Sequence, residues 1–104
     1  MQGLDAIAET IRQDFTTRNA ARDRALIASR ELVRFCSLTI RAVHRAEFAE
    51  ADRLLAEAAA LAEELRQSLL SLPDIFYTGY VQDSLKEFAE ARVFYALVAG
   101  QPLP

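Results

Sequence analysis

The sequence predicts an all-α protein, an antiparallel arrangement of three helices in which the first helix is much longer than the others. The 104 residues include only three Gly and three Pro, and so few turn-forming residues disfavour a β-sandwich or barrel. Apolar residues recur along the chain with helical spacing. They make up 52% of the sequence and the net charge is only −3, which excludes a disordered chain. The length suits one domain, residues 1–104.

The first predicted helix spans about residues 4–45 and contains no Gly or Pro. Asp5 lies near its start, where the helix dipole favours an acidic side chain. Apolar residues follow one face of this helix every seven positions, at Leu26, Val33 and Ile40. A helix of this length extends about 60 Å, which is longer than two shorter neighbours cover.

The other two helices are predicted from their apolar spacing and their stop signals. The second spans about residues 47–72, where Ala and Leu alternate every three or four positions and permit a close helix–helix approach. Pro73 ends it, because proline lacks the amide donor that a helix interior needs. The third helix spans about residues 77–99, with Gly100 as its C-cap and Pro102 beyond it.

Several classes of protein are excluded by what the sequence lacks. A single cysteine, Cys36, rules out a disulfide scaffold, and its place on the apolar seam predicts a core residue. His44 is the only histidine and has no partner at a metal-ligand spacing, which disfavours a zinc site. No apolar run approaches the roughly 18 residues of a membrane span, and no signal peptide precedes the first helix. The sequence therefore predicts no membrane partner and a cytoplasmic location.

A basic stripe follows one face of the first predicted helix. Its residues fall within about 60° of one another on a helical wheel, and guanidinium groups in a line suit contacts to a phosphate backbone. The alternative is a solvated face that pairs with acidic residues of the second helix, such as Glu47, Glu50, Asp52 and Glu57. The stripe consists of Arg30, Arg34, Arg41 and Arg45, with Ser37 and His44 on the same strip.

An acidic stripe follows the third predicted helix. Asp83, Glu87 and Glu90 are spaced i, i+4 and i+7, so their carboxylates lie on one face and repel one another. A hard cation such as Mg²⁺ or Mn²⁺ would turn this repulsion into binding and would activate water for phosphodiester cleavage. The alternative is an ordinary solvent-exposed acidic face.

Two segments resemble the translin family. Residues 22–45, which end in IRAVHR, are similar to the first helix of that family, and residues 79–91, GYVQDSLKEFAEA, are similar to the third. The resemblance covers nearly the whole chain. One branch of the family binds single-stranded RNA and DNA. The branch of translin-associated factor X carries a Glu-x-x-Glu pair and cleaves RNA with Mg²⁺, and the pair Glu87 and Glu90 resembles that branch.

The resemblance implies a function and also a departure from the family. Glu87 and Glu90 would be catalytic residues and metal ligands, whereas Asp83 has no family counterpart. Family members are about twice as long and assemble into hollow octamers, and their second acidic motif comes from a half that this chain lacks. The resemblance therefore implies the N-terminal half of a translin-like fold that binds single-stranded RNA or DNA, with possible Mg²⁺-dependent endoribonuclease activity, and that self-associates or joins a second translin-like chain.

The alternative function is a non-catalytic module for nucleic-acid binding or for oligomeric assembly, because the second acidic motif is missing. Self-association is also expected from the apolar residues of the first helix. Three helices are not expected to bury all of them. The residues concerned are Leu26, Leu32, Val33, Phe35, Leu38 and Ile40.

Overall fold

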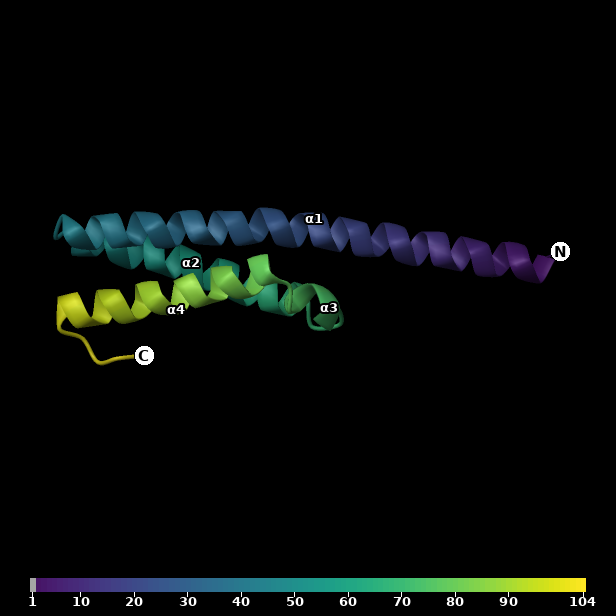
Figure 1. Ribbon diagram of the computed structural model, residues 1–104. Coiled ribbons are helices and arrows are strands. Elements are labelled where there is room, and N and C mark those ends of the chain that lie inside the picture. The colour runs from purple at the N-terminus through teal and green to yellow at the C-terminus, as the bar shows by residue number, and fades with distance from the viewer. Residues whose placement is uncertain (1) are drawn as a thin grey trace.

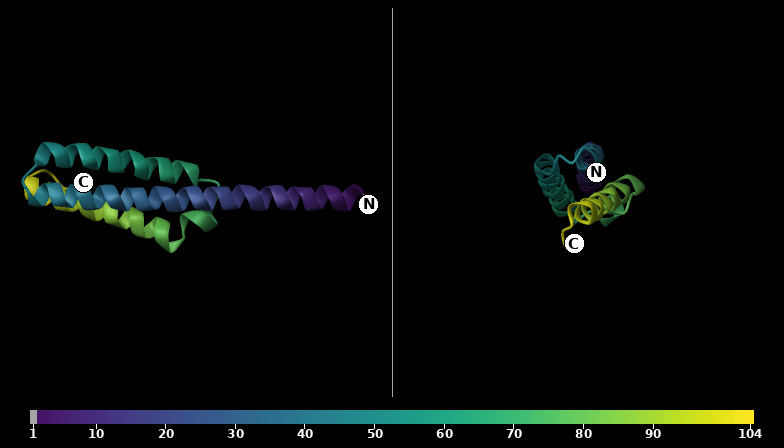
Figure 2. Two further views of the ribbon diagram at one scale, coloured as in Figure 1. Left: turned by 90° about the horizontal axis from the view of Figure 1, so that it is seen from above. Right: turned by 90° about the vertical axis from the view of Figure 1, so that its left-hand side faces the viewer.

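The computed structural model describes residues 2–104, and every regular element in that range is a helix (Figure 1). Helix α1 spans Gln2–His44, α2 spans Phe48–Ser68, α3 spans Pro73–Phe76 and α4 spans Gly79–Ala99. Consecutive long helices run antiparallel, and α2 and α4 lie on either side of the C-terminal part of α1 (Figure 2). The predicted all-α class with a long first helix is confirmed.

The shape is that of a rod. Its principal extents are 68 × 19 × 18 Å and its radius of gyration is 18.4 Å, whereas a compact chain of this size has a radius of gyration of about 13 Å. Helix α1 sets the length, because 43 helical residues rise about 64 Å. The chain thus extends well beyond what α2 and α4 cover.

The region between the second and third predicted helices differs from the expectation. Helix α2 ends at Ser68, before the predicted end at residue 72, and α3 is a separate helix of four residues. Pro73 is the first residue of α3, a position where its missing amide hydrogen costs nothing. Leu69 and Ile75 are both buried, so this corner folds back against the core and carries the chain from α2 to α4.

The core lies between one face of α1 and the facing sides of α2 and α4. Helix α2 contributes mostly small residues, and Ala58 is fully buried, so the helices approach closely. Helix α4 contributes Phe88 and Tyr95, and the Tyr95 hydroxyl donates a hydrogen bond of 2.5 Å to the Asp52 carboxylate of α2. The buried residues of α1 recur every three or four positions, at Ala21, Ala25, Ser29, Leu32, Cys36, Thr39, Ala42 and Val43.

The apolar residues of α1 for which incomplete burial was expected are covered better than expected. Leu32 is fully buried. The other five, at positions 26, 33, 35, 38 and 40, are half-buried, and none of the six is exposed. The bundle formed by α2, α3, α4 and α1 from Ala21 onward therefore covers its own apolar surface on this side of α1.

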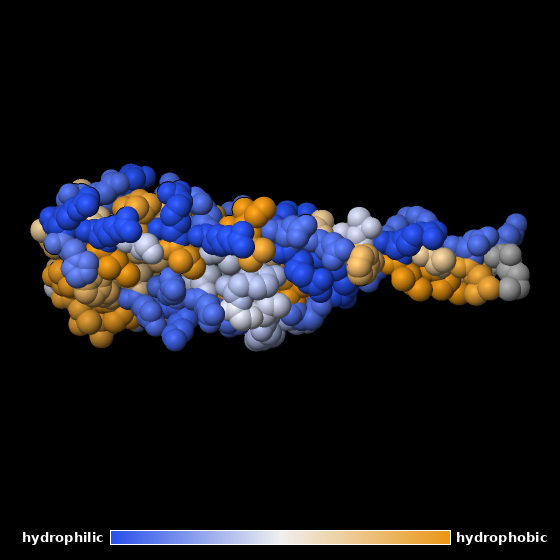
Figure 3. All heavy atoms as spheres, turned by 45° about the horizontal axis from the view of Figure 1, so that its top comes forward, coloured by the Kyte–Doolittle hydropathy of each residue, from blue (hydrophilic) through white to orange (hydrophobic). Residues whose placement is uncertain are grey.

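Four of the five exposed large apolar residues of α1 lie in a different place, and the fifth, Ile27, lies on the outer face of the bundle. Residues 2–17 project beyond the bundle as a free helix, here called the N-terminal arm (Figures 1 and 2). Leu4, Ile7, Ile11 and Phe15 are between 56% and 65% exposed. Figure 3 shows apolar residues gathered along one side of the arm, with polar residues on the other. Among the described residues, no helix is long and apolar enough to cross a membrane.

Candidate nucleic-acid interface

The basic stripe lies on the outer face of α1. The buried residues of α1 face α2 and α4, and the stripe occupies the opposite side of the same helix. All five predicted nucleic-acid-binding residues are exposed, and they are Arg30, Arg34, Arg41, His44 and Arg45. The sequence therefore placed them together on a surface that a ligand can reach.

The stripe does not pair with the acidic residues of α2. Arg34 binds Glu31 of its own helix, with 2.6 Å between Nη2 and Oε1. This bond raises the pKa of Arg34, and lowers that of Glu31, from their ordinary values. Arg30, Arg41 and Arg45 form no ion pair with any residue from 2 to 104. The expected cross-helix pairing is thus absent from the described chain, and three of the four guanidinium groups are free for an external partner.

The acidic residues of α2 have other partners or face solvent. Glu50 binds Arg53 at 2.5 Å, and this bond lowers the pKa of Glu50. Asp52 accepts the hydrogen bond from Tyr95. Arg53 in turn lines a shallow cavity with Arg41 and Arg45 at the α1–α2 turn, with a volume of about 240 Å³. Glu47 and Glu50 line the same cavity, so this end of the stripe has acidic as well as basic side chains beside it, although Arg41 and Arg45 form no ion pair with either carboxylate in the described chain.

His44 and Arg30 lie on the side of the stripe nearest α4. The imidazole of His44 packs against the ring of Phe94, with 5.2 Å between the ring centroids. Arg30 lines a groove between α1 and α4 with a volume of about 440 Å³. The groove has apolar walls from Leu26, Val33 and Tyr80, so this part of the stripe has an apolar hollow beside it.

Two hydroxyl groups at this groove were not predicted from the sequence. Ser29 is only 2% exposed and lines the groove. Its Oγ and the phenol oxygen of Tyr80 are buried without a hydrogen-bond partner in the described chain. A buried hydroxyl without a partner costs free energy, and both oxygens lie beneath the surface of the groove and not on it. The only signal in the sequence is a serine on an otherwise apolar seam.

The three acidic residues of α4 occupy different surroundings. Asp83 lines the groove beside Arg30. Glu87 lies near Cys36 of α1, and its charge adds to the effect of burial, which raises the pKa of that thiol to about 11. Glu90 lines an apolar hollow on the outer side of α4 with Val93 and Leu97, and its Oε1 lies 4.0 Å from the Nζ of Lys86.

The predicted magnesium ligands do not form a complete site. Within residues 2–104, no three His, Cys, Asp or Glu side chains lie close enough together to hold a metal ion. Carboxylate oxygens are the ligands that Mg²⁺ prefers, but Mg²⁺ needs an octahedral set, which two or three carboxylates spaced along one helix do not supply. Asp83, Glu87 and Glu90 would therefore need ligands from elsewhere.

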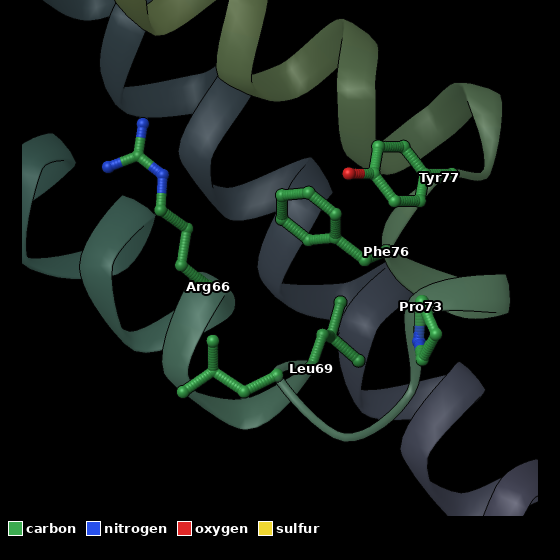
Figure 4. Close-up of a pocket in the computed structure, with 6 residues that line it drawn as sticks. Arg66, Leu69, Pro73, Phe76 and Tyr77 are labelled. Carbon is green, nitrogen blue, oxygen red and sulfur yellow. The ribbon is translucent and has the colours of Figure 1, made fainter.

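A further hollow lies at the opposite end of the bundle, between α2 and α3 (Figure 4). It measures about 240 Å³ and is lined by apolar side chains and by Arg66. Phe76 extends into it between Arg66 and Tyr77, and the ring of Tyr77 meets Phe76 edge-on with 5.0 Å between centroids. Arg66 lies 3.7 Å from Glu63, so this hollow has no free basic group of the kind found on the stripe.

Comparison with known proteins gives no match for this chain among protein-family models, curated proteins or solved structures. The features that bear on function are therefore the sequence motifs and the geometry of the α1 surface. That geometry consists of a row of free guanidinium groups, a groove with two unpartnered hydroxyls beside it, and carboxylates that do not converge.

Proposed function

We propose that this protein binds single-stranded RNA or DNA along the outer face of α1. The observation that carries the proposal is that Arg30, Arg41 and Arg45 are exposed on one face and have no acidic partner in the described chain. Residues 30 to 45 span about 22 Å of helix, a length that covers several phosphates of an extended strand. Free guanidinium groups along that length suit successive phosphate oxygens.

The charge distribution supports a local surface for an anionic strand. The whole chain carries a net charge of −3, so attraction to nucleic acid cannot come from overall charge. Arg34 adds to the surface despite its bond to Glu31, because an exposed ion pair is worth little and exchanges readily. The affinity would therefore come from the stripe itself.

The groove beside Arg30 suits a base of the bound strand. Tyr80 offers an aromatic face, and Leu26 and Val33 offer apolar walls. The hydroxyl oxygens of Ser29 and Tyr80 are buried beneath the groove, so the base would be held by stacking on the Tyr80 ring and by apolar contact. The groove would hold the base, and Arg30, which lines the same groove, would bind the phosphate of the same nucleotide.

The cleavage of RNA with Mg²⁺ that the translin resemblance implies stays a prediction and is not part of this proposal. Glu87 and Glu90 are exposed, and their oxygens are of the right type for Mg²⁺. Because no third ligand lies near them in the described chain, no cleavage step is derived for it. Binding without catalysis is the function that these residues support.

The salt dependence of binding to a labelled single-stranded oligonucleotide tests the proposal. A triple variant with Arg30, Arg41 and Arg45 changed to Ala should bind more weakly, and its plot of log affinity against log salt should be flatter by about two, because each lost phosphate contact removes about 0.7 from the slope. The matched control changes Arg24, Arg66 and Arg92 to Ala, which removes the same charge away from the stripe. If both variants lose affinity and slope equally, the stripe is not the interface.

A further inference from the structure

The N-terminal arm continues the buried seam of the bundle. In the bundle, α1 buries residues 21, 25, 29, 32, 36, 39, 42 and 43, mostly with steps of three or four. Steps of three or four taken backward from the buried Ala21 reach Arg18, and then Phe15, Ile11, Ala8 and Leu4. The arm therefore presents the same face that α2 and α4 cover farther along, but here no element of the described chain covers it (Figure 1).

This face is too apolar to remain in water. Leu4, Ile11 and Phe15 are each more than half exposed, and Ile7 beside them is equally exposed. A contiguous apolar stripe of this kind marks an interaction surface. The arm is continuous with the packed part of α1, and a partner along its apolar face would stabilise it further as a helix.

We propose that the partner is the arm of a second copy of this chain, packed antiparallel to the first. The seam has one side chain at each step of three or four, with Ile7 beside it, and a single facing helix covers a seam of this kind. In an antiparallel pair, Leu4 packs beside Phe15 of the second copy and Ala8 beside Ile11 of the second copy. Two-fold symmetry repeats both layers, so every apolar residue of the seam is covered.

The charges beside the seam fit the antiparallel pair. Asp5 and Arg12 occupy the same side of the seam, each one position after a seam residue. In the proposed layers, Asp5 faces Arg12 of the second copy, and symmetry makes this pair twice. On the other side of the seam Ile7 faces Asp14 of the second copy, and Arg12 exchanges its exposed 2.9 Å ion pair with Glu9 for the new partner. A parallel pair brings no opposite charges together, since Ile7 would face Arg12 and Asp14 would face Asn19, and it would place the two bundles side by side.

The bundle sets the limit of the pairing. Arg18 interrupts the apolar seam, and its guanidinium is held by Asp14 at 3.2 Å and by Asp74 of α3 at 2.8 Å. The seam beyond Ala21 is already filled by the chain's own helices. The antiparallel contact is therefore confined to the arms, and it leaves the basic stripe of each copy open.

Sedimentation over a wide range of concentration tests the apolar part of the proposal. The full chain should form a dimer, and Ile11→Asp should weaken dimerisation more than a hundredfold, since two buried isoleucines are replaced by charges. Ile27→Asp is the matched control, because Ile27 is 68% exposed on the opposite face of the same helix. A monomeric full chain, or a dimer that Ile11→Asp leaves intact, would overturn the proposal.

A charge swap separates a second copy from any other occupant of the arm. Asp5→Arg and Arg12→Asp should each weaken the dimer about tenfold, because each places like charges opposite one another. The double variant should recover most of the loss, because it restores the opposite pair with its signs exchanged. A basic side chain near the helix N-terminus destabilises the helix itself. Circular dichroism of all three variants measures the helix content, so that this effect is separated from the loss of the intermolecular pair. Failure of the double variant to recover would exclude the antiparallel pair.

Discussion

Cys36 illustrates how a single position of α1 connects packing to ionisation. Its side chain is 1% exposed and lies in the seam between α1 and the other helices. Burial disfavours the thiolate, and the nearby charge of Glu87 disfavours it further, so the pKa of the thiol rises to about 11. In the unfolded chain the thiol has its ordinary pKa near 9, and the folded state therefore keeps a proton that the unfolded state loses.

This difference predicts a loss of stability in alkaline solution. The raised pKa means that the contribution is fully present below about pH 9 and is lost as the pH rises towards 11. Between about pH 7.5 and about pH 10.5, the free energy of unfolding should fall by about 2 kcal/mol more in the native sequence than in Cys36→Ala. Urea unfolding of both proteins at both pH values measures the free energy of unfolding. An equal fall in the native sequence and in Cys36→Ala would contradict the burial of this thiol.

Other residue-level features were open to prediction to different degrees. The core position of Cys36 and the common face of Arg30, Arg41 and Arg45 follow from helical spacing, and the structure confirms both. The unpartnered hydroxyls of Ser29 and Tyr80 did not follow from it. Their environment depends on the rotation of α4 against α1, and no local sequence signal specifies that rotation.

At the scale of elements, α2 depends on the small size of its inward residues. Ala51, Ala58 and Ala62 are almost completely buried, whereas Ala59 and Ala60 are exposed on the same helix. Alanine at the buried positions lets α2 approach α1 closely, and a closely packed interior has no room for a larger side chain. The buried face of α2 thus combines small alanines, which allow close approach to α1, with leucines, which fill the space between the helices.

Enlarging a buried alanine should therefore be costly where enlarging an exposed one is not. Ala58→Leu should destabilise the protein by about 1–3 kcal/mol, because overpacking forces strained rotamers or shifts the backbone. Ala59→Leu adds the same side chain on the solvent side and should change stability by less than about 0.5 kcal/mol. Thermal unfolding followed by circular dichroism compares the two, and similar midpoints would show that α2 does not pack closely through Ala58.

The three long helices were predictable because their periodicity is long and uninterrupted. Helix α1 runs from Gln2 to His44 without a break, close to the predicted residues 4–45. The turn helix α3 was missed as an element, because four residues are too few to show a period, and only Pro73 and Asp74 marked a change there. Short elements of this kind are set by how the chain closes over the core, here through Leu69 and Ile75.

The whole molecule separates two surfaces along one helix. The C-terminal part of α1 carries the basic stripe on its outer face. The N-terminal arm carries the apolar face, which Figure 3 shows along one side of the arm. An antiparallel pair of arms places the two bundles at opposite ends of a long rod, so two nucleic-acid surfaces would be joined by one rigid connection. A strand long enough to reach both would bind more tightly than a short one, because the second contact becomes intramolecular.

The positions of the acidic residues in the whole molecule bear on the effect of Mg²⁺ on RNA binding and cleavage. Glu87 lies near Cys36, Glu90 lies by the apolar hollow of outer α4, and no third ligand joins them in the described chain. We expect this chain to bind a labelled single-stranded RNA equally well with Mg²⁺ and with a chelator, whereas the cleavage that the translin resemblance predicts would need Mg²⁺ and further ligands. Glu87→Ala and Glu90→Ala should leave that binding unchanged within about twofold, since neither carboxylate belongs to the stripe.

Electrophoresis of the RNA after incubation, alongside a binding titration of each variant, tests this expectation. Loss of binding when the ion is chelated would contradict it, whereas cleavage that requires Mg²⁺ and is abolished by both substitutions would bear out the activity that the translin resemblance predicts. That result would mean that the two carboxylates hold the ion with ligands from a second chain, since one helix offers too few. Cleavage that survives both substitutions would instead come from a contaminant or from other residues, and in that case the resemblance of the Glu-x-x-Glu pair to the catalytic branch would have no functional meaning here.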